Sequence, residues 1–139
     1  MFPSRVLTLF LNWFPAGAWA GLIFYLSSLP SLTTGLGIWD LLLRKAGHVT
    51  EYFVLTMLIY RALVRTLKKL SFGDFLLKGA LPALIYASSD EFHQSFVPGR
   101  GPSVWDVMID SVGIIFAACL IGKFMLKKSW PNSSKKEGM

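Results

Sequence analysis

Residues 88–101 read SSDEFHQSFVPGRG and place several ionisable side chains directly after the apolar run ALPALIYA. Asp90 and Glu91 are adjacent carboxylates, Gln94 adds an amide, and a Pro-Gly turn signal precedes Arg100. A carboxylate can give or take a proton, and an arginine can hold a phosphate or a carboxylate through two parallel hydrogen bonds. This stretch therefore predicts a polar site at the end of a hydrophobic helix.

Helical spacing adds polar residues from two other segments to this stretch. Residues 45, 48 and 52 share one helix face at i, i+3 and i+7, and residues 103, 106 and 110 share another. The candidate ligand-binding residues are Lys45, His48, Tyr52, Asp90, Glu91, Gln94, Arg100, Asp106 and Asp110. The candidates for acid/base catalysis are His48, Asp90, Glu91 and Asp106.

The elements that must position these residues are apolar helices. The chain has 139 residues, of which 53% are hydrophobic, and its mean hydropathy is +0.51. This apolar content exceeds what an ordinary soluble domain needs to fill its core. Residues 6–29 carry no charge and are long enough to cross a bilayer. The later apolar runs are shorter, and their length alone is also consistent with core helices of a small soluble protein.

Charge position favours the membrane interpretation of these shorter runs. If their acidic residues lie among the lipid headgroups at one end and their basic residues snorkel at the other, the spans become 48–66, 76–94 and 104–124. The sequence therefore predicts an all-α polytopic membrane protein, a four-transmembrane-helix bundle. Pro15 and Pro82 lie inside two of the spans, and we expect each to kink its helix.

The Lys and Arg residues indicate the orientation, because they mark the cytoplasmic side in short loops. Most of them lie before 6–29, around the end of 48–66 and the start of 76–94, or at and after the end of 104–124, whereas the opposite side carries only Arg44, Lys45 and Arg100. Both termini are then cytoplasmic, and the polar residues cluster at the extracytoplasmic helix ends. The basic residues that give the net charge of +6 lie at the ends of hydrophobic spans and form no stripe with interleaved aromatic residues, so we expect no nucleic-acid partner.

The N-terminal segment allows an alternative to an uncleaved first span, and the last span contains the single cysteine. MFPSR followed by AWA at 18–20 also fits a removable signal peptide, but the apolar run continues as GLIFYL, which favours an uncleaved span. The single cysteine, Cys119, lies in the last span and can form no intrachain disulfide.

The predicted outer layer holds more acid than base. Its carboxylates are Glu51, Asp90, Glu91, Asp106 and Asp110, and its cations are Arg44, Lys45 and Arg100. A carboxylate within a membrane helix normally faces a partner or a wet cavity and is a functional candidate. A buried hydrogen-bond and ion-pair network that only holds the helices together is the simpler interpretation, but it does not explain the surplus of acid. A metal site on His48, Glu51, Asp90 and Glu91 is a further alternative, although we expect no metal and no cofactor.

The segments KAGHVTEY and DEFHQSFVPGRGPSVWDVMIDSVG, within a chain of four predicted membrane helices, resemble the VanZ-like family of bacterial integral membrane proteins. The family pattern is Lys-x-x-His-x-x-x-Tyr, then Asp-Glu-x-x-Gln with a Pro-x-Arg turn, then Asp followed four residues later by Asn or Asp and then Gly. The matching positions are Lys45, His48, Tyr52, Asp90, Glu91, Gln94, Pro98, Arg100, Asp106, Asp110 and Gly113. His93 falls at a variable position and inherits no role, and Asp110 takes the acidic option where an amide is common.

The resemblance implies a VanZ-like four-helix membrane domain over 1–128 in the bacterial cytoplasmic membrane, and 129–139 reads as a disordered cytoplasmic tail. It also implies an association with glycopeptide (teicoplanin) resistance. Besides membrane lipids, we expect a lipid-linked cell-wall precursor or a lipoglycopeptide as the partner bound in an extracytoplasmic-facing polar pocket. The alternative is an integral membrane enzyme that acts on a lipid or cell-wall precursor by acid/base chemistry. The chain lacks the metalloprotease, hydrolase-elbow and Walker motifs, so no particular reaction is indicated.

Overall fold

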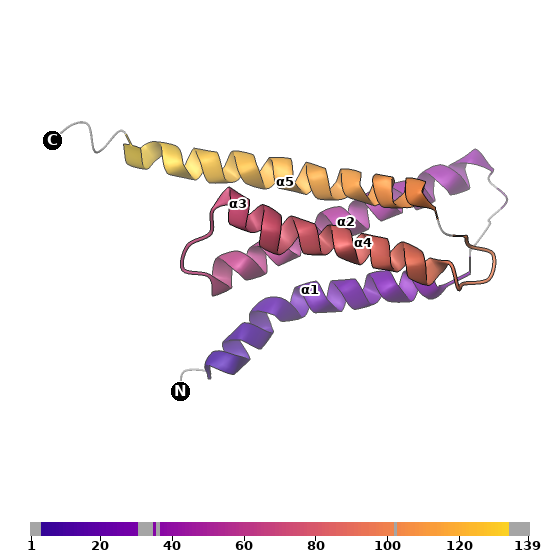
Figure 1. Cartoon of the computed structure of the whole chain (residues 1–139), viewed down its shortest axis with the longest axis horizontal. Helices are drawn as coiled ribbons and strands as arrows, with labels where there is room; N and C mark the ends of the chain where they lie inside the picture. Colours follow the sequence, from indigo (N-terminus) through magenta and orange to yellow (C-terminus); the bar gives the residue numbers. More distant parts are fainter. Residues whose placement is uncertain (1–3, 31–34, 36, 102, 134–139) are drawn as a thin grey trace.

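The computed structural model describes residues 4–30, 35, 37–101 and 103–133, with side chains to residue 127, and every element in this part of the chain is helical (Figure 1). The predicted all-α class is therefore confirmed. The elements are α1 (Arg5–Ser28), α2 (Ile38–Thr66), α3 (Phe72–Phe75), the π-helix η1 (Leu76–Ala80), α4 (Leu81–Gln94) and α5 (Val104–Ser133). Because α3, η1 and α4 follow one another without a gap, the described part of the chain forms four rods.

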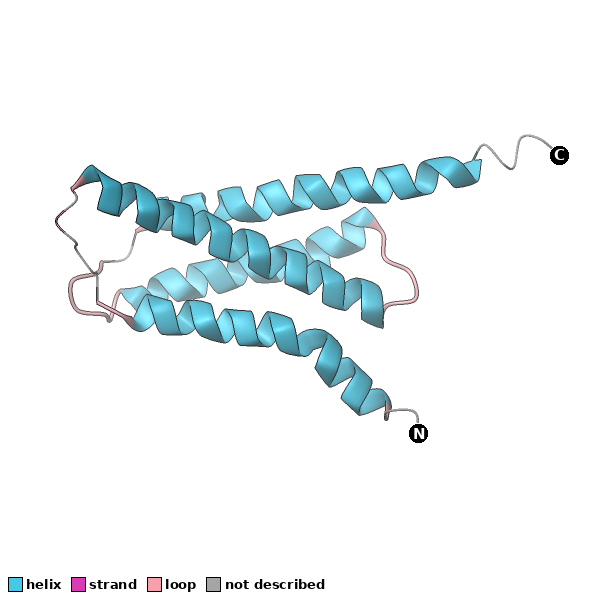
Figure 2. Cartoon of the chain, turned by 180° about the vertical axis from the view of Figure 1, so that it is seen from behind, coloured by secondary structure: helices cyan, strands magenta, loops and turns pink. Residues whose placement is uncertain are grey.

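The four rods run in alternating directions (Figures 1 and 2). The C-terminal ends of α1 and α4 and the N-terminal ends of α2 and α5 lie at one end of the bundle, which we call the site end. The start of α1, the far end of α5 and the loop between α2 and α3 lie at the other end. Short connections between consecutive helices favour this antiparallel neighbour arrangement.

Local sequence explains where several rods begin and how they bend. Ser4 caps α1 by accepting from the Leu7 N–H at 3.3 Å. α1 contains Pro15 and bends in its N-terminal half (Figure 1), as expected where proline removes a backbone hydrogen bond. Before Pro82, at the start of α4, the backbone widens into η1, which makes room for the proline ring.

The loop end of the third rod begins with a capping box. Ser71 and Asp74 exchange side-chain and backbone hydrogen bonds, and Lys78 donates to Asp74 at 3.2 Å. The hydrogen bonds from Ser71, followed by that from Lys78, hold the pKa of the Asp74 carboxyl below its usual value. Asp74 therefore stabilises this helix start in its ionised form.

Two helices extend beyond the boundaries that the sequence predicts. α2 begins at Ile38, ten residues before the predicted span, because the amphipathic stretch IWDLLLRKAGH is helical as well. α5 continues to Ser133, into the segment expected to be a disordered tail, and the rest of that tail lies outside the described residues.

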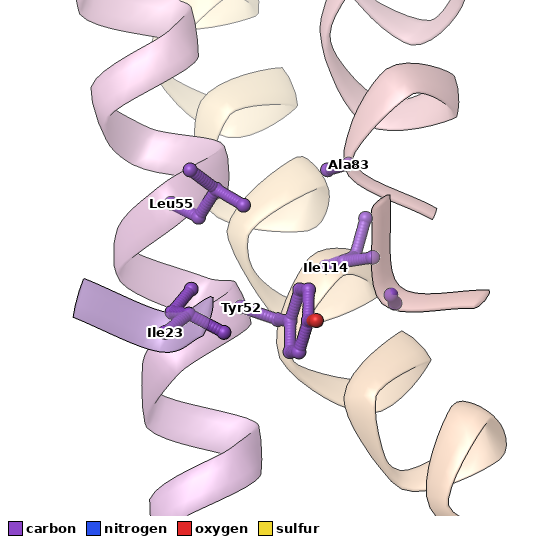
Figure 3. Packing of buried hydrophobic residues seen from close by; sticks show 6 residues of the cluster. Ile23, Tyr52, Leu55, Ala83 and Ile114 are labelled. Carbon is purple, nitrogen blue, oxygen red and sulfur yellow. The ribbon is translucent and has the colours of Figure 1, made fainter. Parts of the chain in front are cut away.

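The bundle interior combines a small apolar core with very close helix contacts. One cluster joins all four rods through Ile23, Tyr52, Leu55, Ala83, Ala87 and Ile114, and Figure 3 shows Tyr52 reaching from α2 toward Ile114 of α5. A second cluster of Leu63, Phe75, Ala118 and Ile121 lies nearer the loop between α2 and α3. At Gly113 a Cβ atom would overlap the Val49 carbonyl oxygen, so only glycine allows α2 and α5 to approach so closely.

The distribution of apolar and polar side chains is the reverse of that in a soluble bundle. Phe92 is 67% exposed, Phe116 is 64% exposed and Phe10 is 59% exposed, whereas Asp110 is completely buried. Two helical segments, Arg5–Ser28 and Val104–Lys127, are long and apolar enough to cross a membrane. Large apolar side chains outside and ionisable groups inside favour a lipid-facing surface over the soluble alternative.

Candidate functional site

The candidate residues converge inside the bundle at the site end. Each rod contributes, because α1 and α4 end there while α2 and α5 begin there (Figure 1). The buried polar side chains of this region are Ser27, His48, Asp90, Glu91, Gln94 and Asp110. Five of these six were predicted from the sequence, and Ser27 was not.

Asp90 is the centre of a three-residue network between α1 and α4. Its Oδ2 accepts from the Ser27 hydroxyl at 2.7 Å and from the Gln94 amide at 2.9 Å. The Gln94 amide also approaches the Ser27 hydroxyl oxygen at 3.3 Å. The i, i+4 spacing of residues 90 and 94 produces their contact, as predicted, while Ser27 is brought in only by helix packing.

His48 of α2 and Asp110 of α5 form a buried pair. The Nδ1 atom of His48 lies 3.0 Å from Oδ1 of Asp110, so a proton on Nδ1 donates to the carboxylate. This contact fixes the ring and leaves Nε2 as the nitrogen able to accept or release a second proton. A histidine oriented by a buried carboxylate is an arrangement suited to acid/base chemistry.

Two further contacts fasten the start of α5 to its neighbours. Lys45 of α2 forms an ion pair with Asp106, and the backbone N–H of Ser103 donates to Glu91 of α4 at 3.0 Å. The Ser103 hydroxyl caps α5 by accepting from the Asp106 N–H at 3.3 Å. Lys45, Glu91 and Asp106 therefore have a clear structural role in addition to any functional one.

Arg100 lies in the loop between α4 and α5 and folds back toward α1. One of its guanidinium nitrogens donates to the Ser27 carbonyl oxygen at 3.3 Å. Its Nε atom is buried and has no hydrogen-bond partner within the described part of the chain. Arg100 thus presents a donor for which the described residues supply no acceptor.

Several buried acceptors in the same region also have no partner among the described residues. They are Oδ1 of Asp90, Oε1 of Glu91 and Oδ2 of Asp110. Tyr52 is fully buried, and its hydroxyl likewise makes no hydrogen bond to a described residue. Most buried polar atoms in proteins are satisfied, so a concentration of unsatisfied ones at one place favours a site where protons, water or a ligand complete the set.

A cavity of about 350 Å³ opens beside this cluster, between α1, α2 and the Arg100 loop. Ser27, His48, Glu51 and Arg100 line it together with residues from the extension of α2. That extension adds Asp40 and Arg44, because residues 38–47 are helical and project past the predicted span.

The structure does not assemble the alternative metal site. Within the described residues no group of three or more His, Cys, Asp or Glu side chains is arranged to hold a metal ion. The proposed ligands are separated because His48 pairs with Asp110, Asp90 faces Ser27, and Glu91 faces the start of α5.

Helix packing brings in residues that the sequence pattern did not identify. Ser27 belongs to the serine pair that ends α1, and the second serine, Ser28, contacts Nε2 of His93 at 3.0 Å. Trp19 of α1 donates to the Glu51 carbonyl oxygen at 2.9 Å. The position of these two serines at the end of an otherwise apolar span was the available signal that they belong to the site. The partners of the two serines could not be predicted, because they depend on the rotation of α1 about its axis.

Comparison with known proteins gives one positive result. A protein-family model described as VanZ/LLP1 matches residues 3–126. A search of curated proteins and a search of solved structures found no match. The family match includes α1 to α4, α5 as far as residue 126 and every candidate site residue, and together with the two apolar spans it indicates a membrane protein. The chain therefore belongs to the VanZ/LLP1 family.

Proposed function

We propose that the chain binds the headgroup of a lipid-linked or amphiphilic envelope molecule in the polar cavity at the site end. The observation that carries this proposal is the set of unsatisfied buried polar atoms beside a 350 Å³ cavity, inside a bundle with an apolar surface. A network that only held the helices together would be expected to satisfy its own donors and acceptors. Here Arg100 offers a buried donor, and Asp90 and Asp110 offer buried acceptors.

We further propose that all four rods cross the bacterial cytoplasmic membrane, with both termini in the cytoplasm and the site end facing outward. The one-sided distribution of Lys and Arg supports this orientation, and the alternating directions of the rods are compatible with it. Reporter fusions after Gly35, Ser71 and Gly101 should be active as outside, inside and outside respectively. An outside signal at Ser71 would remove the basis for an extracytoplasmic site.

A cell-wall precursor or a lipoglycopeptide fits a site with this placement. Both combine a polar, hydrogen-bonding part with a hydrocarbon chain, and the polar cavity opens in a bundle whose outer surface is apolar. Binding such a molecule would connect the chain to the teicoplanin resistance associated with the VanZ-like family.

The His48–Asp110 pair favours a second candidate function, a membrane enzyme that acts on the same class of molecule. Asp110 orients the ring through Nδ1, and His48 lines the cavity. A bound ligand could then exchange a proton with Nε2 while Arg100 holds its anionic group.

One experiment separates the binder from the enzyme. The protein is purified in lipid nanodiscs, incubated with an extract of bacterial envelope lipids, and analysed by native mass spectrometry over time. A retained lipid of unchanged mass supports the binder, and a change in ligand mass that His48→Gln abolishes supports the enzyme. If no envelope lipid is enriched over a nanodisc that holds an Asp90→Asn, Arg100→Gln double variant, the binding proposal is wrong.

A further inference from the structure

A second cavity lies next to the polar one, on the interface between α1 and α2 and further from the site end. It has a volume of about 340 Å³, and its wall is mostly apolar, with Trp19, Leu22 and Ile23 on α1 facing Ala46 and Thr50 on α2. The two cavities have three lining residues in common, Leu26, Gly47 and Glu51. They are therefore adjoining parts of one path between α1 and α2.

We propose that this apolar cavity, the α1–α2 groove, holds the hydrocarbon chain of the bound amphiphile, and that the headgroup in the polar cavity is a phosphate ester that also carries hydroxyl groups. This inference rests on the proposed binding function and specifies its ligand. The molecule then enters sideways from the bilayer, with its chain between α1 and α2.

The lining of the polar cavity selects the headgroup chemistry. Arg44 and Arg100 lie on its wall, and Arg100 holds a buried donor with no described partner, which suits a phosphate oxygen. Asp40 and Glu51 lie on the same wall, and carboxylates accept hydrogen bonds from hydroxyl groups. A phosphate joined to a glycerol or a sugar presents both kinds of partner, whereas a phosphate alone would meet carboxylates that it repels.

Gly47 is the residue that keeps the two cavities connected. It borders both of them, and a Cβ atom added there meets no other atom within 4 Å. A larger side chain at this position would extend into the connection between the cavities, and its Cβ atom would not clash with a neighbouring helix. Gly47→Leu is therefore expected to obstruct the path for the chain while α2 stays folded, since leucine favours a helix more than glycine does.

Gly21 provides the matched control. It also lies within a helix and has no atom within 4 Å of an added Cβ, but it is exposed and does not line the groove. Gly21→Leu repeats the change in size, hydrophobicity and helix propensity. A difference between the two variants therefore reports on the groove.

The probe is an alkyl phosphoglycerol with a diazirine near the end of its chain, added to the protein in nanodiscs and activated by light. We expect cross-links at Leu22 or Thr50. The yield of these cross-links should fall roughly tenfold or more in Gly47→Leu, because each excluded methylene costs about fourfold in affinity. It should not change in Gly21→Leu. Free glycerol phosphate should compete weakly, and an alkyl maltoside with the same diazirine should not label the groove.

The alternative outcomes separate this inference from the proposed function. If the probe is retained in an Arg100-dependent way but cross-links elsewhere, or labels Gly47→Leu as well as the unchanged protein, the groove assignment is wrong and the headgroup site stands. Labelling by the maltoside equal to that by the phosphoglycerol overturns the headgroup chemistry. If neither probe nor envelope lipid is retained, the inference and the proposed function both fail.

Discussion

Asp90→Asn tests whether the buried carboxylates serve a site or only hold the helices together. Asp90 is 3% exposed, and one of its oxygens accepts both of its hydrogen bonds, from Ser27 at 2.7 Å and from Gln94 at 2.9 Å. The other oxygen has no partner among the described residues. An asparagine can place its oxygen on the bonded side and its amide on the unbonded side, so both contacts survive without the charge.

The size of the effect follows from these contacts. A hydrogen bond to a charged group contributes about 1.5–3 kcal/mol and a neutral one about 0.5–1.5 kcal/mol, so neutralising two bonds costs roughly 2–3 kcal/mol. Removing a buried charge that costs several kcal/mol to desolvate offsets most of that loss. We therefore expect Asp90→Asn to change the free energy of unfolding by no more than about 1 kcal/mol. Asp90→Ala removes the acceptor that both donors share and leaves only the longer Gln94–Ser27 contact at 3.3 Å, so it should cost about 2–4 kcal/mol.

The assay is reversible unfolding in mixed micelles by SDS titration, followed by circular dichroism, together with envelope-lipid binding and the teicoplanin sensitivity of the host. We expect the asparagine variant to be stable and to bind more weakly, because Ser27, which lines the polar cavity, then donates to a neutral group in place of a carboxylate. If Asp90→Asn is as unstable as Asp90→Ala, the reasoning from acceptor geometry is refuted and the structural network is the better explanation. If it is stable and binds normally, the charge at this position has no role in the site.

Three further expectations concern packing, ligand binding and pH. Gly113→Ala should lower the free energy of unfolding by about 1–3 kcal/mol in the same SDS titration, because the new methyl overlaps the Val49 carbonyl oxygen, and Gly17→Ala, at an open helix position, should not. Arg100→Lys keeps the charge but loses the planar fork, so native mass spectrometry should detect at least about tenfold weaker lipid binding, and unchanged binding would reduce the residue to a point charge. The folded pKa of Asp74 lies below its unfolded value, so the stabilisation by its carboxylate is complete above the unfolded pKa and is lost as pH falls through the folded pKa. The melting temperature, measured between about pH 5 and pH 2.5, should therefore fall less steeply with pH for Asp74→Asn than for the unchanged protein.

The rods themselves could be predicted well from the sequence, while their boundaries could not. Apolar runs and charge positions identified one helical rod at each predicted span, and the third rod ends at Gln94 as expected. The start of α2 was missed because a span is recognised by its apolar residues, and the charged turns that include Asp40 and Arg44 continue the helix outside that criterion. Those turns supply part of the cavity wall.

The sequence by itself determined which residues stand on a common helix face, because a period of 3.6 residues fixes the faces without knowledge of the neighbours. That is why residues 45, 48 and 52 share one face of α2 and residues 106 and 110 share one face of α5, so that two contacts, Lys45 with Asp106 and His48 with Asp110, join the same pair of faces.

Tertiary structure alone decided which face meets which. It paired His48 with Asp110 and Lys45 with Asp106, turned Ser27 toward Asp90, and left the path beside Gly47 open between α1 and α2. These contacts depend on the rotation and separation of the helices. Rotation and separation are set by close packing between rods, as at Gly113, and not by the preferences of any one segment.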